Sequence, residues 1–264
     1  MIRALFIGLL VLLFAGALVW KTRAPKPNSP MNGSAMGTSW TLAWRGDAPK
    51  DLRKHIAGVL EHWEQTLSQW RADSDLSQFN RGKLASPDLQ RVLDLAESIR
   101  TASGGAFDHR ILADVHAAGY GPSGNGVDLS AIGKGFAVDR VGEKLRSIGM
   151  HDFVFELGGE VLAGDGEWAV EIERPQNGKR EISRHLTLRK RALATSGNYH
   201  QPGHLIDPRT HQPVQRPPCS VSVLADDCAT ADAWATALFV LGPDFRDYPK
   251  DLEVTWRFAT EDTR

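Results

Sequence analysis

The sequence predicts an α+β fold with mixed, largely antiparallel sheets and packed helices. Helical and strand patterns interleave along the chain, but four strand patterns, at 153–158, 167–173, 184–190 and 219–225, follow one another with no helical pattern between them. Consecutive strands can pair as hairpins, whereas a doubly wound parallel sheet needs a helix between successive strands. With 264 residues, 42% of them hydrophobic, the chain suffices for one large domain or two closely packed lobes.

The elements of the first half follow from periodicity and punctuation. In "TSWTLAW", the alternation of Trp40, Leu42 and Trp44 predicts a half-buried strand. Apolar residues at helical spacing predict a helix over 51–69, and the polar stretch 71–82 predicts a loop. A second helix is predicted from Ser86, which can cap it, through the glycines at 104 and 105, which end it.

The second half begins with a glycine-rich loop, "HAAGYGPSGNG". A helix is predicted over 131–148, followed by the four strands named above. The stretch 231–242 is apolar on every side at 100° per residue, which is typical of a buried helix. A last strand is predicted over 252–260.

The N-terminus differs in character from the rest. Residues 1–20 carry Arg3 and then an apolar run from Ala4 to Trp20, which is at the short end of the about 17–25 residues that a membrane-spanning helix needs. This suits a signal anchor or a cleaved signal peptide. Residues 21–31 form a Pro-rich tether, and 32–264 the main domain.

The formal net charge of the chain, -1, argues against nucleic acid as a partner.

Several suggestive patterns lack the context that their function requires. "GYGPSG" fits the dinucleotide fingerprint, but no apolar strand precedes it and no helix can follow it, so it is interpreted as a loop. His200 and His204 are four apart, yet Pro202 and Gly203 exclude a helical metal pair. Cys219 and Cys228 flank a predicted strand, whose length separates them too far for a disulfide.

A carboxylate and a hydroxyl share one face of the apolar helix at 231–242. Asp232 and Thr236 are four residues apart, and no Lys or Arg lies between 229 and 241 to pair with the acid. A buried carboxylate is costly unless it is paired or binds a metal. Oxygen ligands of this kind suit Mg²⁺. The alternative is that Asp232 lies at an exposed edge of the helix or near its positive end.

Seven motifs in order resemble the ApbE family, the FAD:protein FMN transferases, over nearly all of the chain after the tether. They are "AMGTSWTL", "LSQWRADSDLSQFN", "SGGAFDHRI", "VDLSAIGKGFAVDR", "FELGGEVLAGDGEWAVEIERP", "ATSGNYHQPGHLIDPRT" and "CATADAWATALFVLG". The resemblance implies a two-lobed, T-fold-like domain that binds FAD between its lobes.

The resemblance also implies an activity. Family members use Mg²⁺ to split FAD, release AMP and attach FMN through a phosphoester bond to a Thr or Ser hydroxyl of an acceptor flavoprotein. The acceptor would be an NqrC/RnfG-like subunit or a similar redox protein on the periplasmic side of the inner membrane. The alternatives are a Mg²⁺-dependent FAD pyrophosphatase that yields FMN and AMP, and a flavin-binding protein without turnover.

Carried over by motif, the family's functional residues fall on specific positions of this chain. The metal ligands would be Asp232, Thr236 and the carbonyl of Ala131, and the catalytic base would be His204. The FAD contacts would be Met36, Trp70, Ala106, Phe107, Asp108, Asp128, Lys134 and Ile206.

Two of these positions carry alternative interpretations, and one position departs from the family. Lys134 would add positive charge near the phosphates or would pair with a surface acid. Trp70 would offer a flat surface for a ring, or would be the last apolar position of the preceding helix. In "DPRTHQP", His211 stands where the family has Gly; if that position needs a positive φ, His carries strain there. No Cys lies near the N-terminus to carry a lipid.

Overall fold

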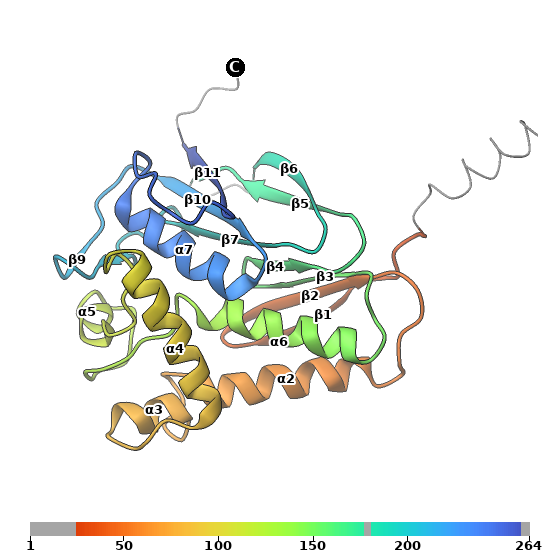
Figure 1. Ribbon diagram of the computed structural model, residues 1–264, viewed down its shortest axis with the longest axis horizontal. Coiled ribbons are helices and arrows are strands. Elements are labelled where there is room, and N and C mark those ends of the chain that lie inside the picture. Colours follow the sequence, from red (N-terminus) through yellow and green to blue (C-terminus); the bar gives the residue numbers. More distant parts are fainter. Residues whose placement is uncertain (1–24, 177–180, 260–264) are drawn as a thin grey trace, which may run out of the picture.

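The computed structural model describes residues 25–176 and 181–259 (Figure 1). The centre of this part of the chain is a seven-stranded sheet in the order β1-β2-β3-β4-β7-β10-β11, antiparallel at every pairing. Its strands are β1 (Met31–Ala35), β2 (Thr38–Trp44), β3 (Phe153–Leu157), β4 (Glu160–Ala163), β7 (Ala192–Gly197), β10 (Cys219–Ala225) and β11 (Glu253–Phe258). The predicted α+β class with largely antiparallel sheets is confirmed.

Helices cover one face of the sheet (Figure 1). They include α2 (Leu52–Leu67), α4 (Pro87–Ala102), α6 (Gly133–Ser147) and α7 (Cys228–Leu241). The helix α6 packs on β3 and β4, and α7 packs on β7 and β10. Because α7 also contacts α6 and α4, it has neighbours on several sides, which explains why its sequence is apolar all round. All four helices lie where the sequence predicts them, with α7 beginning three residues earlier.

Two short helices were not predicted. The helix α3 (Asp75–Asn80) lies in the stretch interpreted as a polar loop, so that prediction is wrong. The Ser74 hydroxyl caps it by accepting a hydrogen bond from the Ser77 N–H at 3.0 Å, and Leu76 is fully buried. The helix α5 (Leu112–Ala117) precedes the glycine-rich loop. Helices of one or two turns are too short to show a hydrophobic period.

The opposite face of the sheet has a smaller core of its own. The hairpin of β5 (Trp168–Glu173) and β6 (Ile182–Leu188) packs Trp168, Ile172 and Leu188 against Ala163 and Leu193 of the sheet. A two-residue pairing, β8 (Ile206–Asp207) with β9 (Gln212–Pro213), completes the strands of the described residues.

The N-terminal predictions fall mostly outside this description. Residues 1–20, predicted as a signal anchor or signal peptide, lie outside the described residues, as does the first part of the tether. Residues 25–30 are exposed and without regular structure. In the part of the chain that the structure describes, no helix is both long enough and apolar enough to cross a membrane. Cys219 and Cys228 are both buried and free, in agreement with the predicted absence of a disulfide.

Candidate active site

Asp232 is buried at the crossing of α6 and α7, with 4% of its surface exposed. Its Oδ2 accepts a hydrogen bond from the Gly135 N–H at 3.0 Å. A Cβ at Gly135 would overlap the carbonyl of Cys228 and lie 2.8 Å from the Cβ of Asp232. The two helices therefore meet backbone to backbone, and Asp232 faces the first turn of α6, just after Ala131. This burial contradicts the alternative that Asp232 lies at an exposed edge.

Asp232 shares one lysine with a second buried acid. The Lys134 Nζ lies 2.8 Å from Oε1 of Glu160, and Asp232 interacts with the same ammonium. Glu160 is 3% exposed, and its Oε2 is buried without a hydrogen-bond partner. Two carboxylates thus face one ammonium, which leaves one negative charge in excess when both are ionised. Lys134 pairs with a buried acid, not with the surface acid of the alternative interpretation.

Burial changes the acid–base properties of this cluster. It raises the pKa of Glu160 to about 8, although Lys134 opposes the shift. It raises the pKa of Asp232 as well, against the opposing effects of Lys134 and of the Gly135 N–H. For Lys134, burial lowers the pKa but the two carboxylates outweigh it, so the pKa is raised and the ammonium stays charged.

Thr236 lies one turn after Asp232 on the same face of α7, as predicted. Its Oγ1 is 3.1 Å from the Oγ of Ser196 in β7, and it is half-buried. Among the described residues, no three His, Cys, Asp or Glu side chains gather closely enough to hold a metal ion by themselves. The predicted ligands are of a different kind, since they comprise one carboxylate, one hydroxyl and the backbone carbonyl of Ala131.

His204 approaches the same lysine from the segment before β8. Its Nδ1 donates to the carbonyl of Gln201 at 2.5 Å, so the hydrogen of the neutral ring lies on Nδ1 and Nε2 is an acceptor. Burial lowers the pKa of His204, the charge of Lys134 lowers it further, and the Gln201 carbonyl opposes both. His204 is therefore neutral at pH 7 and able to take up a proton on Nε2.

Met36 and Trp70 lie near the end of α2. Met36 and Gly37 form the two-residue turn between β1 and β2, both with positive φ. The Met36 N–H donates to Oε2 of Glu64 in α2 at 2.9 Å. Trp70 comes after the end of α2 at Leu67 and is 68% exposed. The interpretation of Trp70 as the last apolar position of that helix is therefore wrong, and its ring is available to a ligand.

The residues predicted from "GAFD" and "DLS" are joined through the backbone. Ala106 and Phe107 are buried, and Asp108 pairs with Arg110 at 2.7 Å between Oδ2 and Nη2. The Asp128 N–H donates to the carbonyl of His109 at 2.7 Å. Oδ1 of Asp128 accepts hydrogen bonds from Ser130, whereas its Oδ2 is buried without a partner. A buried carboxylate oxygen without a hydrogen-bond partner calls for an explanation, and a ligand that binds here would supply the missing partner.

Ile206 is buried in β8, and the turn after it carries the departure from the family motif. His211 has φ 59°, so the position does require a left-handed backbone, for which the family's Gly is suited. Its Nδ1 lies 3.0 Å from Oδ2 of Asp114 in α5, and its N–H donates to the carbonyl of Asp207 at 2.8 Å. These two contacts offset part of the backbone strain.

Three contributing residues were missed by sequence reasoning. Asn80 holds the backbone of Val127 in place, donating through Nδ2 and accepting through Oδ1, both at 2.8 Å. Ser196 contacts Thr236, and Glu160 pairs with Lys134. Glu160 carried a readable signal, because "EVLA" is an apolar strand that begins with an acid and has no basic residue beside it in the sequence, the same anomaly that Asp232 presents. For Ser196, the sequence gives no comparable signal.

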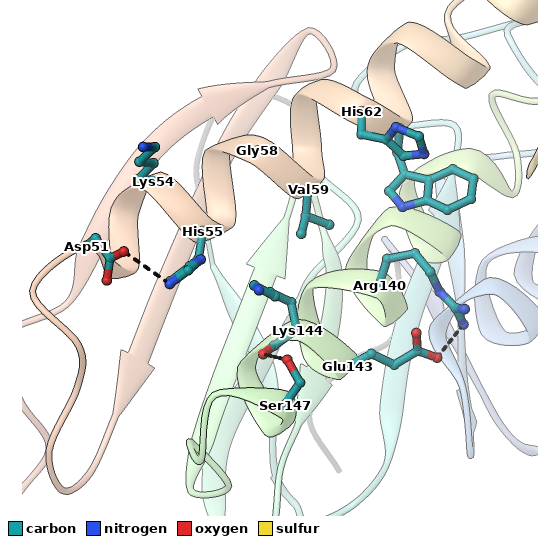
Figure 2. A pocket seen from close by; sticks show the side chains of 11 residues that line it. Asp51, Lys54, His55, Gly58, Val59, His62, Arg140, Glu143, Lys144 and Ser147 are labelled. Carbon is teal, nitrogen blue, oxygen red and sulfur yellow. Dashed lines mark hydrogen bonds and ion pairs between the residues drawn. The ribbon is translucent and has the colours of Figure 1, made fainter.

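A groove of about 660 Å³ lies elsewhere, between α2 and α6 (Figure 2). Two pairs of its side chains interact, His55 with Asp51 at 3.3 Å and Arg140 with Glu143 at 2.7 Å. None of the predicted site residues lines it. The candidate active site is therefore the buried cluster around Lys134, where acids, an ammonium and a neutral histidine converge.

The start of α7, which carries Asp232, is held by Asp139 of α6. The two oxygens of Asp139 accept hydrogen bonds from the N–H groups of Cys228 and Ala229, at 2.8 and 2.9 Å. Burial raises the pKa of Asp139 to about 7, although both N–H groups oppose the shift. An asparagine could accept only one of these bonds and would turn its NH₂ toward the other donor.

We expect Asp139→Asn to lower the free energy of unfolding by about 1–3 kcal/mol, because it leaves a buried N–H without an acceptor. Urea denaturation followed by circular dichroism measures the change. Asp226→Asn is the matched control. The Asp226 side chain is 83% exposed, and its ion pair with Arg191, 3.5 Å from Oδ1 to Nε, lies at the surface. This variant should therefore change stability by less than about 0.5 kcal/mol. Equal losses in the two variants would contradict the role of Asp139.

Fold and site together define an α+β protein with a buried acid–base cluster where two helices cross, and clusters of this kind are typical of enzyme active sites. A family model described as "ApbE family" matches residues 36–126 and 121–254. The chain belongs to the ApbE family.

Individual relatives agree with this assignment. The chain is 31% identical to the FAD:protein FMN transferase of Vibrio cholerae, over 83% of each chain. It is 29% identical to that of Haemophilus influenzae, over 85% of this chain and 82% of the relative. Among solved structures, the flavin transferase ApbE from Vibrio cholerae superposes with a TM-score of 0.73 at 26% identity, covering 89% of this chain and 98% of that one.

Proposed function

We propose that this protein is an FAD:protein FMN transferase that attaches FMN through a phosphoester bond to a Thr or Ser hydroxyl of an acceptor flavoprotein and releases AMP. The observation that carries the proposal is the cluster of Lys134, Glu160, Asp232 and His204, which is assembled from four of the family's motifs. The names of the relatives support the transfer of FMN from FAD. In this proposal, FAD binds between the lobes of the domain.

The residues present fit a Mg²⁺ ion. Oxygen atoms of Asp232 and Thr236 and the carbonyl of Ala131 form a hard ligand set, and a cation beside them would favour the ionised form of the buried carboxyl of Asp232, which burial alone disfavours. When bound, such an ion would supply neutralisation of the pyrophosphate charge. The Gly135 N–H restrains the orientation of the Asp232 carboxylate by donating a hydrogen bond to its Oδ2.

The chain's own residues supply the remaining requirements of the transfer. The bond between the FMN phosphorus and the bridging oxygen breaks, that oxygen leaves with AMP, and the acceptor hydroxyl oxygen bonds to phosphorus. His204 takes the hydroxyl proton on Nε2. Lys134 holds a positive charge beside the phosphates, and the exposed ring of Trp70 contributes a flat surface for a ring of FAD.

Mass spectrometry of the products tests the function. The purified domain is incubated with FAD, Mg²⁺ and a candidate acceptor, such as an NqrC/RnfG-like subunit, and the acceptor is expected to gain one FMN at a Thr or Ser. Release of AMP at the same rate without an acceptor would instead identify an FAD pyrophosphatase. Stoichiometric FAD that persists unchanged would identify a flavin-binding protein without turnover.

We also propose that the domain faces the periplasm and is attached to the inner membrane through residues 1–20. The apolar run from Ala4 to Trp20 and the Pro-rich tether support this. Fractionation of cells that express the full chain should place it with the membranes, accessible to protease only after the outer barrier is opened. Recovery from the cytoplasm would contradict the proposal.

We expect Trp70→Ala to weaken FAD binding by about fivefold to tenfold, the equivalent of about 1 kcal/mol for a lost ring contact. Its thermal unfolding midpoint should not change, because the side chain is 68% exposed and supports no core. Quenching of flavin fluorescence measures the affinity. Leu84→Ala, which removes a side chain that is 96% exposed, is the matched control. Equal affinity of Trp70→Ala and the control would show that Trp70 does not contact FAD.

A further inference from the structure

The glycine-rich loop contacts the segment that carries the proposed base. The loop follows α5 and is fixed to it by backbone hydrogen bonds: the Gly119 N–H donates to the His116 carbonyl at 2.9 Å and the Tyr120 N–H to the Val115 carbonyl at 3.0 Å. The side chain of His116 also contacts the carbonyl of Gly121 at 3.0 Å. The backbone around Tyr120 is therefore fixed relative to α5, so the Tyr120 side chain starts from a well-defined position.

Tyr120 makes two contacts across to this segment. Its hydroxyl donates to the carbonyl of Pro202 at 2.7 Å. Its ring lies edge-on to the ring of His204, with 5.9 Å between centroids and 67° between planes. Pro202 directly follows Gln201, whose carbonyl accepts the hydrogen bond of the His204 Nδ1–H. Tyr120 thus holds one of two successive carbonyls, and the other sets the ring orientation of His204.

A third contact joins the same two parts of the chain. The Nδ1 of His211, in the turn after β8, lies 3.0 Å from Oδ2 of Asp114 in α5. The segment from Gln201 to His211 is therefore attached to the α5 region at both of its ends, at Pro202 by Tyr120 and at His211 by Asp114. This explains how an irregular segment can hold a half-buried imidazole in one orientation.

We propose that Tyr120 is a positioning residue for His204, acting through its hydrogen bond to the Pro202 carbonyl. This inference rests on the proposed role of His204 as the base that accepts the hydroxyl proton. Tyr120 touches neither the phosphates nor the acceptor in this scheme. It holds the peptide between Pro202 and Gly203, and through it the adjoining Gln201 carbonyl, so that the hydrogen stays on Nδ1 and Nε2 keeps both its direction and its free lone pair.

Tyr120→Phe is the sharpest test, because it removes only the hydroxyl. In FMN transfer to an acceptor flavoprotein, kcat is expected to fall by about threefold to tenfold, the size of one lost hydrogen bond, while the KM for FAD changes by less than about twofold. Tyr248→Phe makes the same chemical change at a half-buried tyrosine outside the site and should leave kcat unchanged. A fall in kcat of equal size in both variants would overturn the proposal.

The His204→Ala background separates positioning from a general effect on the fold. If Tyr120 acts through His204, adding Tyr120→Phe to His204→Ala should cause no further loss of kcat. A further loss of the same threefold to tenfold size would show that Tyr120 acts by another route.

Nitrogen NMR of the His204 ring gives a readout that needs no turnover. Wild-type protein should show the neutral ring protonated on Nδ1, and Tyr120→Phe should show a larger share protonated on Nε2. An unchanged tautomer ratio with reduced kcat would overturn the proposal while leaving His204 as the base. Full transfer activity of His204→Ala alone would contradict the proposed base itself, which is a different failure.

Discussion

Replacement of Asp232 by alanine is expected to lower FMN transfer by a factor on the order of 10²–10³, the usual effect of removing one group that stabilises transition-state charge. Asp232 is the only carboxylate among the three predicted metal ligands, and it is buried beside Lys134. Its loss would remove the negative charge that holds the cation and leave one carboxylate, Glu160, to balance Lys134. The measurement is the rate of FMN attachment to the acceptor as a function of Mg²⁺ concentration.

Asp232→Asn provides the matched comparison. The amide oxygen still accepts the hydrogen bond from the Gly135 N–H, so the crossing of α6 and α7 should be retained. We expect this variant to fold and to unfold at a similar temperature, but to need a much higher Mg²⁺ concentration for residual transfer. If transfer by Asp232→Ala keeps the wild-type rate and metal dependence, the metal site lies elsewhere.

His204→Gln is expected to lower kcat by about 10²–10⁴-fold with little change in the affinity for FAD, because only the proton acceptor is lost. The wild-type rate should also depend on pH in a direction fixed by the pKa of His204. Burial lowers that pKa below the ordinary value of 6.5, so the neutral, proton-accepting form predominates at pH 7. The rate should therefore be nearly constant above neutrality and fall as the pH drops through the lowered pKa.

His204→Gln should lose this pH dependence together with most of its kcat for FMN transfer. Residual transfer by His204→Gln should show no step in the acidic range, whereas FAD binding, followed by flavin fluorescence, should match that of the wild type. Lost FAD binding in the variant would make His204 a binding residue. A pH profile that remains identical to the wild type would assign the titration to another group.

The fold class could be predicted because the relevant signals are local. Alternation in β2, helical spacing in α2, and the cap at Ser86 with its terminal glycines each depend on residues close in sequence. The prediction of a loop for the polar stretch that forms α3 failed, because the helix there depends on one buried apolar side chain, Leu76, and on the cap residue Ser74. The order of strands in the central sheet is set by contacts between distant segments, which periodicity does not report.

The site was predictable in part for the same reason. Asp232 was conspicuous because an acid in an apolar helix demands a partner, and His204 and Lys134 followed from the resemblance. The partners themselves come from other parts of the chain: Glu160 from β4 and Tyr120 from a loop that the sequence marks only as rich in glycine. No local pattern could reveal that this loop, set aside as a false dinucleotide motif, contacts the proposed base.

The contact at Gly135 has a consequence for how this chain can vary. Because Gly135 has no side chain, the main chains of α6 and α7 approach each other closely at this point, and this approach sets the spacing of the neighbouring lysine and the aspartate. A single added methyl group at this point would overlap the carbonyl of Cys228, so an alanine in place of Gly135 would force the two helices apart and separate Asp232 from Lys134.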